Sequence, residues 1–298
     1  MGQSRHLDGV HSSSAWGPIA TVMGDVAALT LCAIAVIDVA LDSALPLCHR
    51  GRWPRGFGRR RMTWSIIAHD ARTGRVGIAV ATRFFAVGAL VPHIETGVGA
   101  IATQAFINPH YGPLGLAMLR KGLSAVEAVD ELARGDAGRH NRQLHVMDRE
   151  GRFAAYTGAA CIDWCGHETR ETFSAAGNML AGPAVLAETI RVYEAQSALP
   201  LARRLIAAMR AGEAAGGDKR GKQSAALLIH DGEAFPLYDL RVDDHPDPLR
   251  ELARLEDVAR QRWVHFRRQM PSQARPSGLT DRGELEELVS RSIAEGYE

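Results

Sequence analysis

Short apolar segments rich in β-forming residues recur along the chain between residues 63 and 104. Residues 63–69 and 76–82 are predicted strands, and residues 70–74 between them carry the Asp and Gly that favour a turn. The second strand is almost entirely apolar, which is typical of a strand buried on both faces. Residues 87–94 and 97–104 have the same character, so we expect a sheet whose core strands are covered by other layers.

A helical spacing of apolar residues replaces this pattern from residue 111 onward. Residues 111–121 form one predicted helix. Ser124 and Glu127 form a capping box, in which each side chain satisfies a backbone donor at the start of a second helix. Gly135 can end that helix.

The rest of the chain continues this mixture of strands and helices. The pattern predicts a hairpin over 143–157, a strand over 173–177, helices from about 184 and over 201–212, strands over 224–229 and 237–242, an amphipathic helix over 249–266, a linker over 271–280 and a short final helix. This order indicates an α+β fold with helices on the outer faces of sheets. We expect a domain over residues 62–248 and a helical C-terminal extension over 249–298.

The first 61 residues differ from the rest in charge. They carry seven Arg and four Asp, whereas the whole chain is nearly balanced, with 35 basic and 34 acidic residues. The apolar run over residues 26–37 is shorter than the ~20 residues that a membrane-spanning helix needs. An export or membrane segment stays open as an alternative. We favour an extension that is disordered, or translation that starts at Met62.

The overall composition excludes several classes of protein. A net charge of +1 gives no support to nucleic-acid binding, and 46% hydrophobic residues exclude a wholly disordered chain. Four Cys in 298 residues exclude a disulfide scaffold. We therefore expect a cytoplasmic protein with a small-molecule partner, no nucleic acid and no membrane; self-association into a homo-oligomer is left open.

Thr63 is the first candidate for chemistry. A threonine at the start of a mature chain carries its own general base, because its free α-amine lies beside its hydroxyl. Removal of an initiator Met62 would expose Thr63 in this way. The alternative is that Thr63 is an ordinary strand residue, since Thr is a good β-former.

Asn178 is the second candidate, in a glycine-flanked segment between a strand and a predicted helix start. An amide side chain near the free N–H groups of a helix N-terminus suits an oxyanion hole. A tight strand–helix connection is the structural alternative.

Two cationic features could hold an anionic substrate group. Arg83 stands between two apolar runs, where a cation needs a carboxylate partner or a substrate anion. The glycine-rich segment 216–226 carries Asp218, Lys219 and Arg220, and a solvated loop is the alternative for it.

Cys161, Cys165 and His167 have a spacing that zinc ligands can adopt, but the second pair of a zinc site is missing. We expect no metal and no cofactor. The acceptor-rich segment 243–247 is expected to cap the helix that follows it.

Several segments in one order resemble a bacterial family labelled domain of unknown function 1028, which is placed in the N-terminal-nucleophile (Ntn) hydrolase superfamily. The segments are TWSIIA at 63–68, VATRFFAVG at 80–88, GAIATQ at 99–104, NPHYG at 108–112, CIDW at 161–164, GNMLAG at 177–182, GGDKRGKQSA at 216–225 and RVDDHP at 241–246. The resemblance covers residues 62 to about 252.

The resemblance implies a four-layer αββα sandwich and cleavage of a small amide by an N-terminal nucleophile. By this analogy Thr63 is the nucleophile, and Asn178 lies in the segment that helps to form the oxyanion hole. We expect Arg83, Gln104, Asp218, Lys219 and Arg220 to bind substrate. The acid and Lys partners of proteasome-type subunits have no clear match here. A non-catalytic Ntn-like protein that binds a metabolite or a partner is therefore the alternative, and a membrane-tethered protein is a weaker one.

Overall fold

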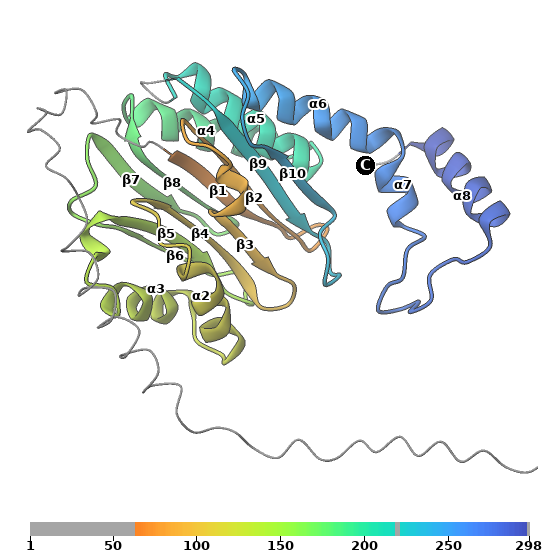
Figure 1. The fold of residues 1–298 in the computed structure, drawn as a ribbon, viewed down its shortest axis with the longest axis horizontal. Helices are drawn as coiled ribbons and strands as arrows, with labels where there is room; N and C mark the ends of the chain where they lie inside the picture. Colours follow the sequence, from red (N-terminus) through yellow and green to blue (C-terminus); the bar gives the residue numbers. More distant parts are fainter. Residues whose placement is uncertain (1–62, 218–220, 297–298) are drawn as a thin grey trace, which may run out of the picture. The chain divides into compact units, whose positions relative to one another are not determined.

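A computed structural model describes residues 63–217 and 221–296 as two antiparallel β-sheets with helices on their outer sides (Figure 1). The strands are β1 (Thr63–Asp70), β2 (Arg75–Thr82), β3 (Pro92–Glu95), β4 (Gly99–Ala105), β5 (Arg142–Met147), β6 (Phe153–Thr157), β7 (Trp164–Thr169), β8 (Phe173–Leu180), β9 (Ser224–His230) and β10 (Tyr238–Val242). The helices are η1 (Val87–Ala89), α2 (Tyr111–Arg120), α3 (Ala125–Arg134), η2 (Arg139–Asn141), α4 (Pro183–Ala195), α5 (Leu201–Ala214), α6 (Pro248–Gln261), α7 (Trp263–Arg267) and α8 (Arg282–Glu295).

The larger sheet has six strands in the order β10-β9-β2-β1-β8-β7, and the smaller has four in the order β3-β4-β5-β6. Strand β1 lies inside the larger sheet and pairs with β2 on one side and β8 on the other. The prediction of an α+β fold is confirmed at this level. The inner position of β1 agrees with the burial of its residues 63–68.

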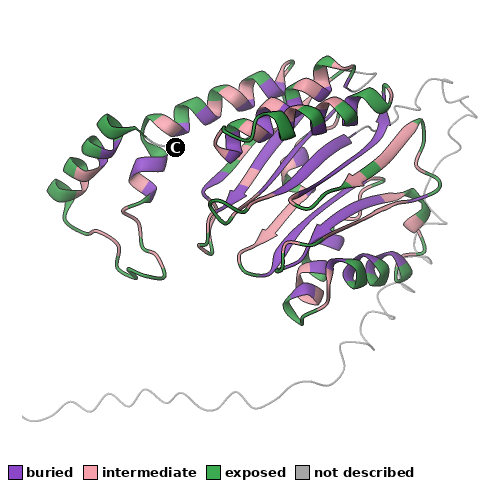
Figure 2. Cartoon of the chain, turned by 180° about the vertical axis from the view of Figure 1, so that it is seen from behind, coloured by how far each residue is buried: buried purple, intermediate pink, exposed green. Residues whose placement is uncertain are grey.

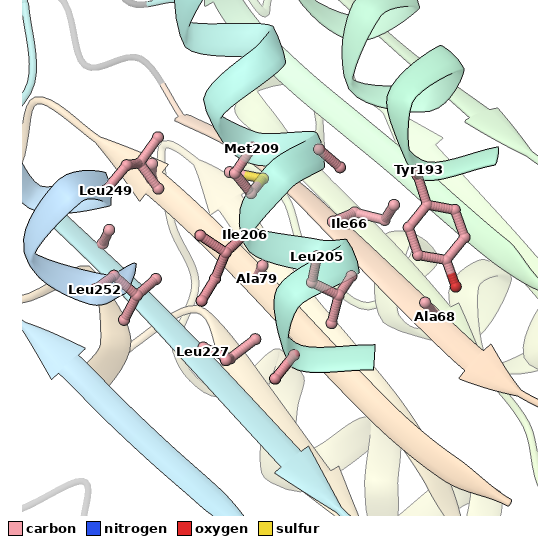
Figure 3. Packing of buried hydrophobic residues seen from close by; sticks show 14 of the residues in the cluster. Ile66, Ala68, Ala79, Tyr193, Leu205, Ile206, Met209, Leu227, Leu249 and Leu252 are labelled. Atoms are coloured by element: carbon pink, nitrogen blue, oxygen red, sulfur yellow. The ribbon is translucent and has the colours of Figure 1, made fainter. Parts of the chain in front are cut away.

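Alternate residues of β1 face two different layers, because successive strand side chains point to opposite faces. Ile66 packs with Leu205 of α5 and Tyr193 of α4 in the cluster that Figure 3 shows. Ile67, its neighbour, packs with Met147 of β5 between the two sheets. Strand β1 is thus enclosed by helices on one face and by the second sheet on the other.

Each sheet has its own helices. Helices α4, α5 and α6 contribute to the core on the outer face of the larger sheet, and α2 and α3 contribute to the core on the outer face of the smaller one. Figure 2 shows the buried residues concentrated in the strands and on the sheet-facing sides of these helices. The capping box at Ser124 is confirmed: its hydroxyl accepts from the Glu127 backbone N–H, and the Glu127 carboxylate accepts from Ser124.

Four elements differ from the sequence-based prediction. The strand predicted over 173–177 extends to Leu180 as β8, so Asn178 lies within this strand and not in a connection before a helix. The strand predicted over 87–94 is a short helix, η1, followed by β3, because Ala86 adopts a left-handed conformation that turns the chain. Strand β7 was not predicted, because it is a polar edge strand without an apolar run. The helix predicted over 249–266 is broken at Arg262 into α6 and α7.

Helix α6 begins inside the main core. Leu249 and Leu252 are fully buried in the cluster that contains α5 and β9 (Figure 3). The start of the expected C-terminal extension therefore packs directly on the larger sheet. The expectations for residues 1–61 fall outside the described residues. Across 63–217 and 221–296, no helix is both long and apolar enough to cross a membrane.

Helices α4 and α5 meet closely at Gly212, where a Cβ would overlap Thr189 Oγ1 and lie 3.0 Å from Val185 O. We expect Gly212→Ala to lower the free energy of unfolding by about 1–3 kcal/mol, because an added methyl group overpacks this contact. Urea unfolding of the full chain measures the change. Adding Thr189→Ala, which removes the obstructing oxygen, should recover part of the loss; a double variant no more stable than the Gly212→Ala single variant would contradict the overpacking account.

Candidate functional site

Thr63 is the first residue of β1 and lies between the ends of its two neighbouring strands. Its partners in register are Thr82 on β2 and Asn178 on β8. Its Oγ1 donates to Thr82 Oγ1 at 3.1 Å, and the residue is 7% exposed. The predicted nucleophile and the predicted oxyanion residue are thus direct neighbours, although 115 positions separate them in the chain.

A small cavity of about 20 Å³ adjoins Thr63. Its lining residues are Thr63, Phe84, Val87, Leu90, Val91, Gln104, Ala105 and Ile107. A space of this size holds about one water-sized group. Thr63 and Gln104 are the polar residues in a lining that is otherwise apolar, so Gln104, which was expected to bind substrate, adjoins the same space as the Thr63 side chain.

Gln143 on β5 is the centre of a buried hydrogen-bond network between the two sheets. Its Nε2 lies 2.9 Å from Gly177 O, 3.0 Å from Gly166 O and 2.8 Å from Thr157 Oγ1, so its two hydrogens are shared among three acceptors. A backbone carbonyl can only accept, so the Gln143 nitrogen must face these oxygens. Its Oε1 therefore faces the opposite way, toward the Thr63 end of the network.

Two other amides donate to that oxygen. Gln104 Nε2 lies 2.8 Å from Gln143 Oε1, and Asn178 Nδ2 lies 3.0 Å from it. Because Gln143 Oε1 can only accept, the orientation of both amides follows from that of Gln143. The backbone carbonyls of β7 and β8 thus determine which way the Gln104 and Asn178 amides point.

The same directions continue to Ser65 and His145. Gln104 Oε1 accepts from Ser65 Oγ at 2.6 Å, which takes the single hydroxyl hydrogen of Ser65. His145 Nε2, 2.9 Å from Ser65 Oγ, must then be the donor to it. In a neutral ring, His145 Nδ1 is then the acceptor for the Ser174 hydroxyl at 3.0 Å. The network therefore places the hydrogen of a neutral His145 on Nε2.

Burial agrees with a neutral ring. His145 is fully buried, and this desolvation lowers its pKa to about 3, with a smaller contribution from the charge of His167. A group with this pKa carries no proton charge at neutral pH. His145 therefore holds Ser65 by hydrogen bonding and not by charge.

The amide hydrogens of Asn178 both have acceptors within the protein. One points to Thr63 O at 3.3 Å and the other to Gln143 Oε1 at 3.0 Å. Its Oδ1 is buried and has no hydrogen-bond partner within the described part of the chain. This pattern favours a positioning role for Asn178, in which it holds Thr63. It does not favour the role of oxyanion donor that was expected from the sequence.

The backbone around this site is conformationally unusual. The described non-glycine residues with positive φ are Ala86, Ala105, Asp163 and Met179, at 53°, 69°, 57° and 56°. All four lie in segments at the Thr63 end of the strands, and two of them directly follow Gln104 and Asn178. β8 also has a register irregularity against β7 between Trp164 and Gly166. Such local strain is concentrated at functional sites in proteins, and bulges redirect side chains.

Arg83 follows β2 directly, one residue beyond the partner of Thr63, and its side chain is exposed. A Cβ on Gly221 would lie 3.0 Å from Arg83 Nη1, so the glycine-rich loop returns beside this guanidinium. Asp218, Lys219 and Arg220 fall outside the described residues. Lys222, at the end of that loop, pairs with Glu213 at 3.0 Å and Asp247 at 2.9 Å.

The other sequence motifs take structural positions. Cys161 Sγ and Cys165 Sγ donate to the backbone oxygens of Arg142 and Cys161, and burial raises the pKa of both thiols, that of Cys161 to about 11. His167 Nδ1 lies 2.8 Å from Thr157 Oγ1. Asp247 caps α6 by accepting from the Arg250 N–H, as expected for that segment.

A second, larger cavity of about 300 Å³ lies at the opposite end of β1. His69, Val76 and His230 line it from three neighbouring strands, and Met147 and Arg149 line it from the smaller sheet side. His230 is 8% exposed, and burial lowers its pKa. The space between the sheets thus has two different ends, a small cavity at Thr63 and a larger one at His69.

Four residues of this network were not predicted from the sequence: Ser65, Gln143, His145 and Ser174. A signal was present: Gln143 and His145 are polar residues two positions apart, on the same face of an otherwise buried strand. Polar groups at core-facing positions must have partners, so this spacing indicates a buried network.

The low pKa of His145 predicts a pH-dependent stability. The unfolded chain binds a proton at His145 below pH 6.5, whereas the folded chain stays neutral down to about pH 3. The free energy of unfolding should therefore fall as pH decreases from 6 toward 4, with His145 contributing about 1.4 kcal/mol per pH unit, and be unaffected by His145 above pH 7.

Urea unfolding of the full chain against pH measures this slope. His145→Gln should reduce the slope between pH 6 and 4 by about one proton, while the other ionisable groups remain the same. An unchanged slope would show that His145 is protonated in the folded state.

The site lies in a segment that comparison with known proteins identifies. A family of unknown function, DUF1028, matches residues 63–252. Protein SPO2555 from Silicibacter pomeroyi, a DUF1028 crystal structure, is 35% identical over 74% of this chain and 100% of that chain, with a TM-score of 0.69. Anbu, the ancestral β-subunit from Yersinia bercovieri, is 13% identical over 73% of this chain and 100% of that chain, with a TM-score of 0.33. Comparison with curated proteins gives no match. The match over residues 63–252 includes all ten strands and both sheets, and the chain belongs to the DUF1028 family.

Proposed function

We propose that this protein is an amidohydrolase that uses Thr63 as an N-terminal nucleophile on a small amide. The observation that carries the proposal is the position of Thr63. It begins an inner strand, it adjoins a small cavity that Gln104 also lines, and the Asn178 amide donates to its carbonyl. The family match also begins at this residue. We further propose that the two sheets and their outer helices form the four-layer αββα arrangement of Ntn hydrolases.

The α-amine of Thr63 is the general base in this proposal. In the full chain this nitrogen is part of the peptide bond to Met62 and has no basic lone pair. Removal of the preceding residues converts it to an amine with a pKa of ~8, which can take the hydroxyl proton of the same residue. Activity therefore requires a chain that begins at Thr63.

The reaction proceeds in two stages, acylation of Thr63 and hydrolysis of the acyl ester. Thr63 Oγ attacks the amide carbonyl carbon, its proton moves to the α-amine, and the carbonyl electron pair moves onto oxygen. The intermediate collapses with cleavage of the C–N bond, and the α-ammonium returns the proton to the leaving amine. Water then hydrolyses the acyl ester to release a carboxylic acid and restore Thr63.

The cavity and its surroundings indicate the type of substrate. The apolar side chains beside Thr63 suit a small apolar acyl group. The cavity volume of about 20 Å³ excludes a large acyl group. Arg83, which directly follows the strand residue paired with Thr63, suits a carboxylate on the leaving-amine side. We propose a small acyl amide with a carboxylate as the substrate class.

The alternative function is non-catalytic binding of a metabolite. The cavity of about 300 Å³ at the His69 end favours it, since ligand pockets begin at about this size. In this case Thr63 remains blocked by the residues before it.

Exposure of Thr63 tests the proposal directly. In the variant used, a factor Xa recognition sequence replaces residues 59–62, so that cleavage exposes Thr63. We expect the uncleaved folded chain to be inactive and the cleaved chain to gain amidase activity. Release of glycine from N-acetylglycine measures turnover, and the cleaved Thr63→Val variant, which keeps the α-amine, is the control. Equal hydrolysis by cleaved and uncleaved chains would contradict an N-terminal nucleophile.

Arg83 provides a test of the substrate class. In the cleaved protein, Arg83→Gln should lower kcat/KM for N-acetylglycine by about 10–100-fold, because a charge-assisted hydrogen bond contributes about 1.5–3 kcal/mol. N-acetylglycinamide, which lacks the carboxylate, should be affected much less. An equal loss of kcat/KM for the two substrates would show that Arg83 does not bind the substrate carboxylate.

A further inference from the structure

We propose that Gln104 Nε2 donates the hydrogen bond that stabilises the oxyanion in the Thr63 reaction; this inference rests on the proposed function. All but one of the amide hydrogens in the network have acceptors. The Gln143 nitrogen faces three acceptor oxygens, and both Asn178 hydrogens have acceptors at Thr63 O and Gln143 Oε1. Gln104 Nε2 donates one hydrogen to Gln143 Oε1. Its second hydrogen has no acceptor within residues 63–217 and 221–296.

Gln104, which carries this hydrogen, lines the same small cavity as Thr63. The partner of Gln104 Oε1 is Ser65, which is two residues beyond Thr63 on the same face of β1, a separation of about 7 Å along the strand. An acyl carbonyl attacked by Thr63 Oγ in this cavity would meet apolar side chains on its other sides, so Gln104 is the side-chain donor available to it.

Gln104 is held rigidly in this orientation. Ser65 fixes its oxygen at 2.6 Å and Gln143 fixes its nitrogen at 2.8 Å, and the residue is 1% exposed. The left-handed conformation of Ala105 ends β4 immediately after it. A donor that is already oriented before charge develops needs no reorganisation in the transition state, which is the condition for effective oxyanion stabilisation.

The proposal separates the roles of the two amides. Asn178 holds the Thr63 carbonyl and thereby positions the nucleophile, whereas Gln104 contacts the reacting oxygen. Gln143 orients both and contacts neither the substrate nor the Thr63 hydroxyl. The oxyanion donor thus comes from the smaller sheet and the nucleophile from the larger one.

p-Nitrophenyl acetate is the probe for this role, because its acetyl group suits the small cavity. Thr63 Oγ bonds to the acetyl carbon and the C–O bond to p-nitrophenolate breaks, so the phenolate leaves with the bonding electron pair and the hydroxyl proton passes to the α-amine. The experiment uses the full chain, folded and then cleaved by factor Xa before Thr63. The rate of p-nitrophenolate release above that of Thr63→Val reports attack by the hydroxyl.

Gln104→Met and Ser65→Ala form a matched pair of variants. Gln104→Met keeps the side-chain length but removes the donor, and one oxyanion donor contributes about 10²–10³-fold to rate. Ser65→Ala breaks the same network at the other end of Gln104 and keeps the donor. We expect a 10²–10³-fold loss of the Thr63-dependent rate in Gln104→Met and a smaller loss in Ser65→Ala, which frees the Gln104 oxygen but keeps the donor, with circular dichroism confirming that both are folded.

Two results would overturn the inference in distinguishable ways. If Thr63→Val removes the reaction but Gln104→Met retains it within tenfold, Gln104 is not the oxyanion donor and the proposed function stands. If the cleaved protein reacts no faster than Thr63→Val, the nucleophile assignment is wrong and the role of Gln104 falls with it.

Discussion

The orientation of one buried amide, that of Gln143, determines the polar half of the space between the sheets. Backbone carbonyls on β7 and β8 can only accept hydrogen bonds, so they hold the Gln143 nitrogen toward the larger sheet. From this single constraint follow the directions of the Gln104 and Asn178 amides, and then of Ser65 and His145. Because each member is fully buried, reversing one amide would leave two acceptors or two donors facing each other, at a cost of about 1–3 kcal/mol for each unmatched group.

The space between the sheets has an apolar half and a polar half, and both lie along β1. Toward the His69 end, Ile67 packs against Met147 in an apolar cluster that supports the fold. Toward the Thr63 end the same face of β1 is polar, and its side chains are ordered by hydrogen bonds. The apolar half supplies burial, while the polar half supplies directed donors beside Thr63. This division explains how the structure keeps several polar side chains in its interior next to a residue proposed to react.

Much of the fold could be predicted from sequence, because strand and helix periodicity is local. β1, β2 and the capped helix α3 follow directly from it. The prediction that Thr63 and Asn178 share one site depended on a family resemblance and not on their spacing. These residues are 115 positions apart and meet only through the β1–β8 register. The spacing of Gln143 and His145 indicates buried polar groups, but their partners could not be predicted for the same reason. Gln143, Gln104 and Asn178 lie on different strands, and amide directions depend on backbone carbonyls that no side-chain pattern reveals. The polar edge strand β7 was hidden because it lacks an apolar run.

The tautomer of His145 tests the central claim most directly, because it is the last link in the chain of directions that begins at Gln143. Nitrogen-15 NMR of the histidine side chains of the full chain distinguishes the two ring nitrogens. The account predicts a neutral His145 with hydrogen on Nε2 and a bare Nδ1, unchanged between pH 7 and pH 5, in agreement with a pKa of about 3. A neutral ring with hydrogen on Nδ1, or protonation of His145 within this range, would contradict the hydrogen-bond directions on which the roles of Gln104 and Asn178 depend.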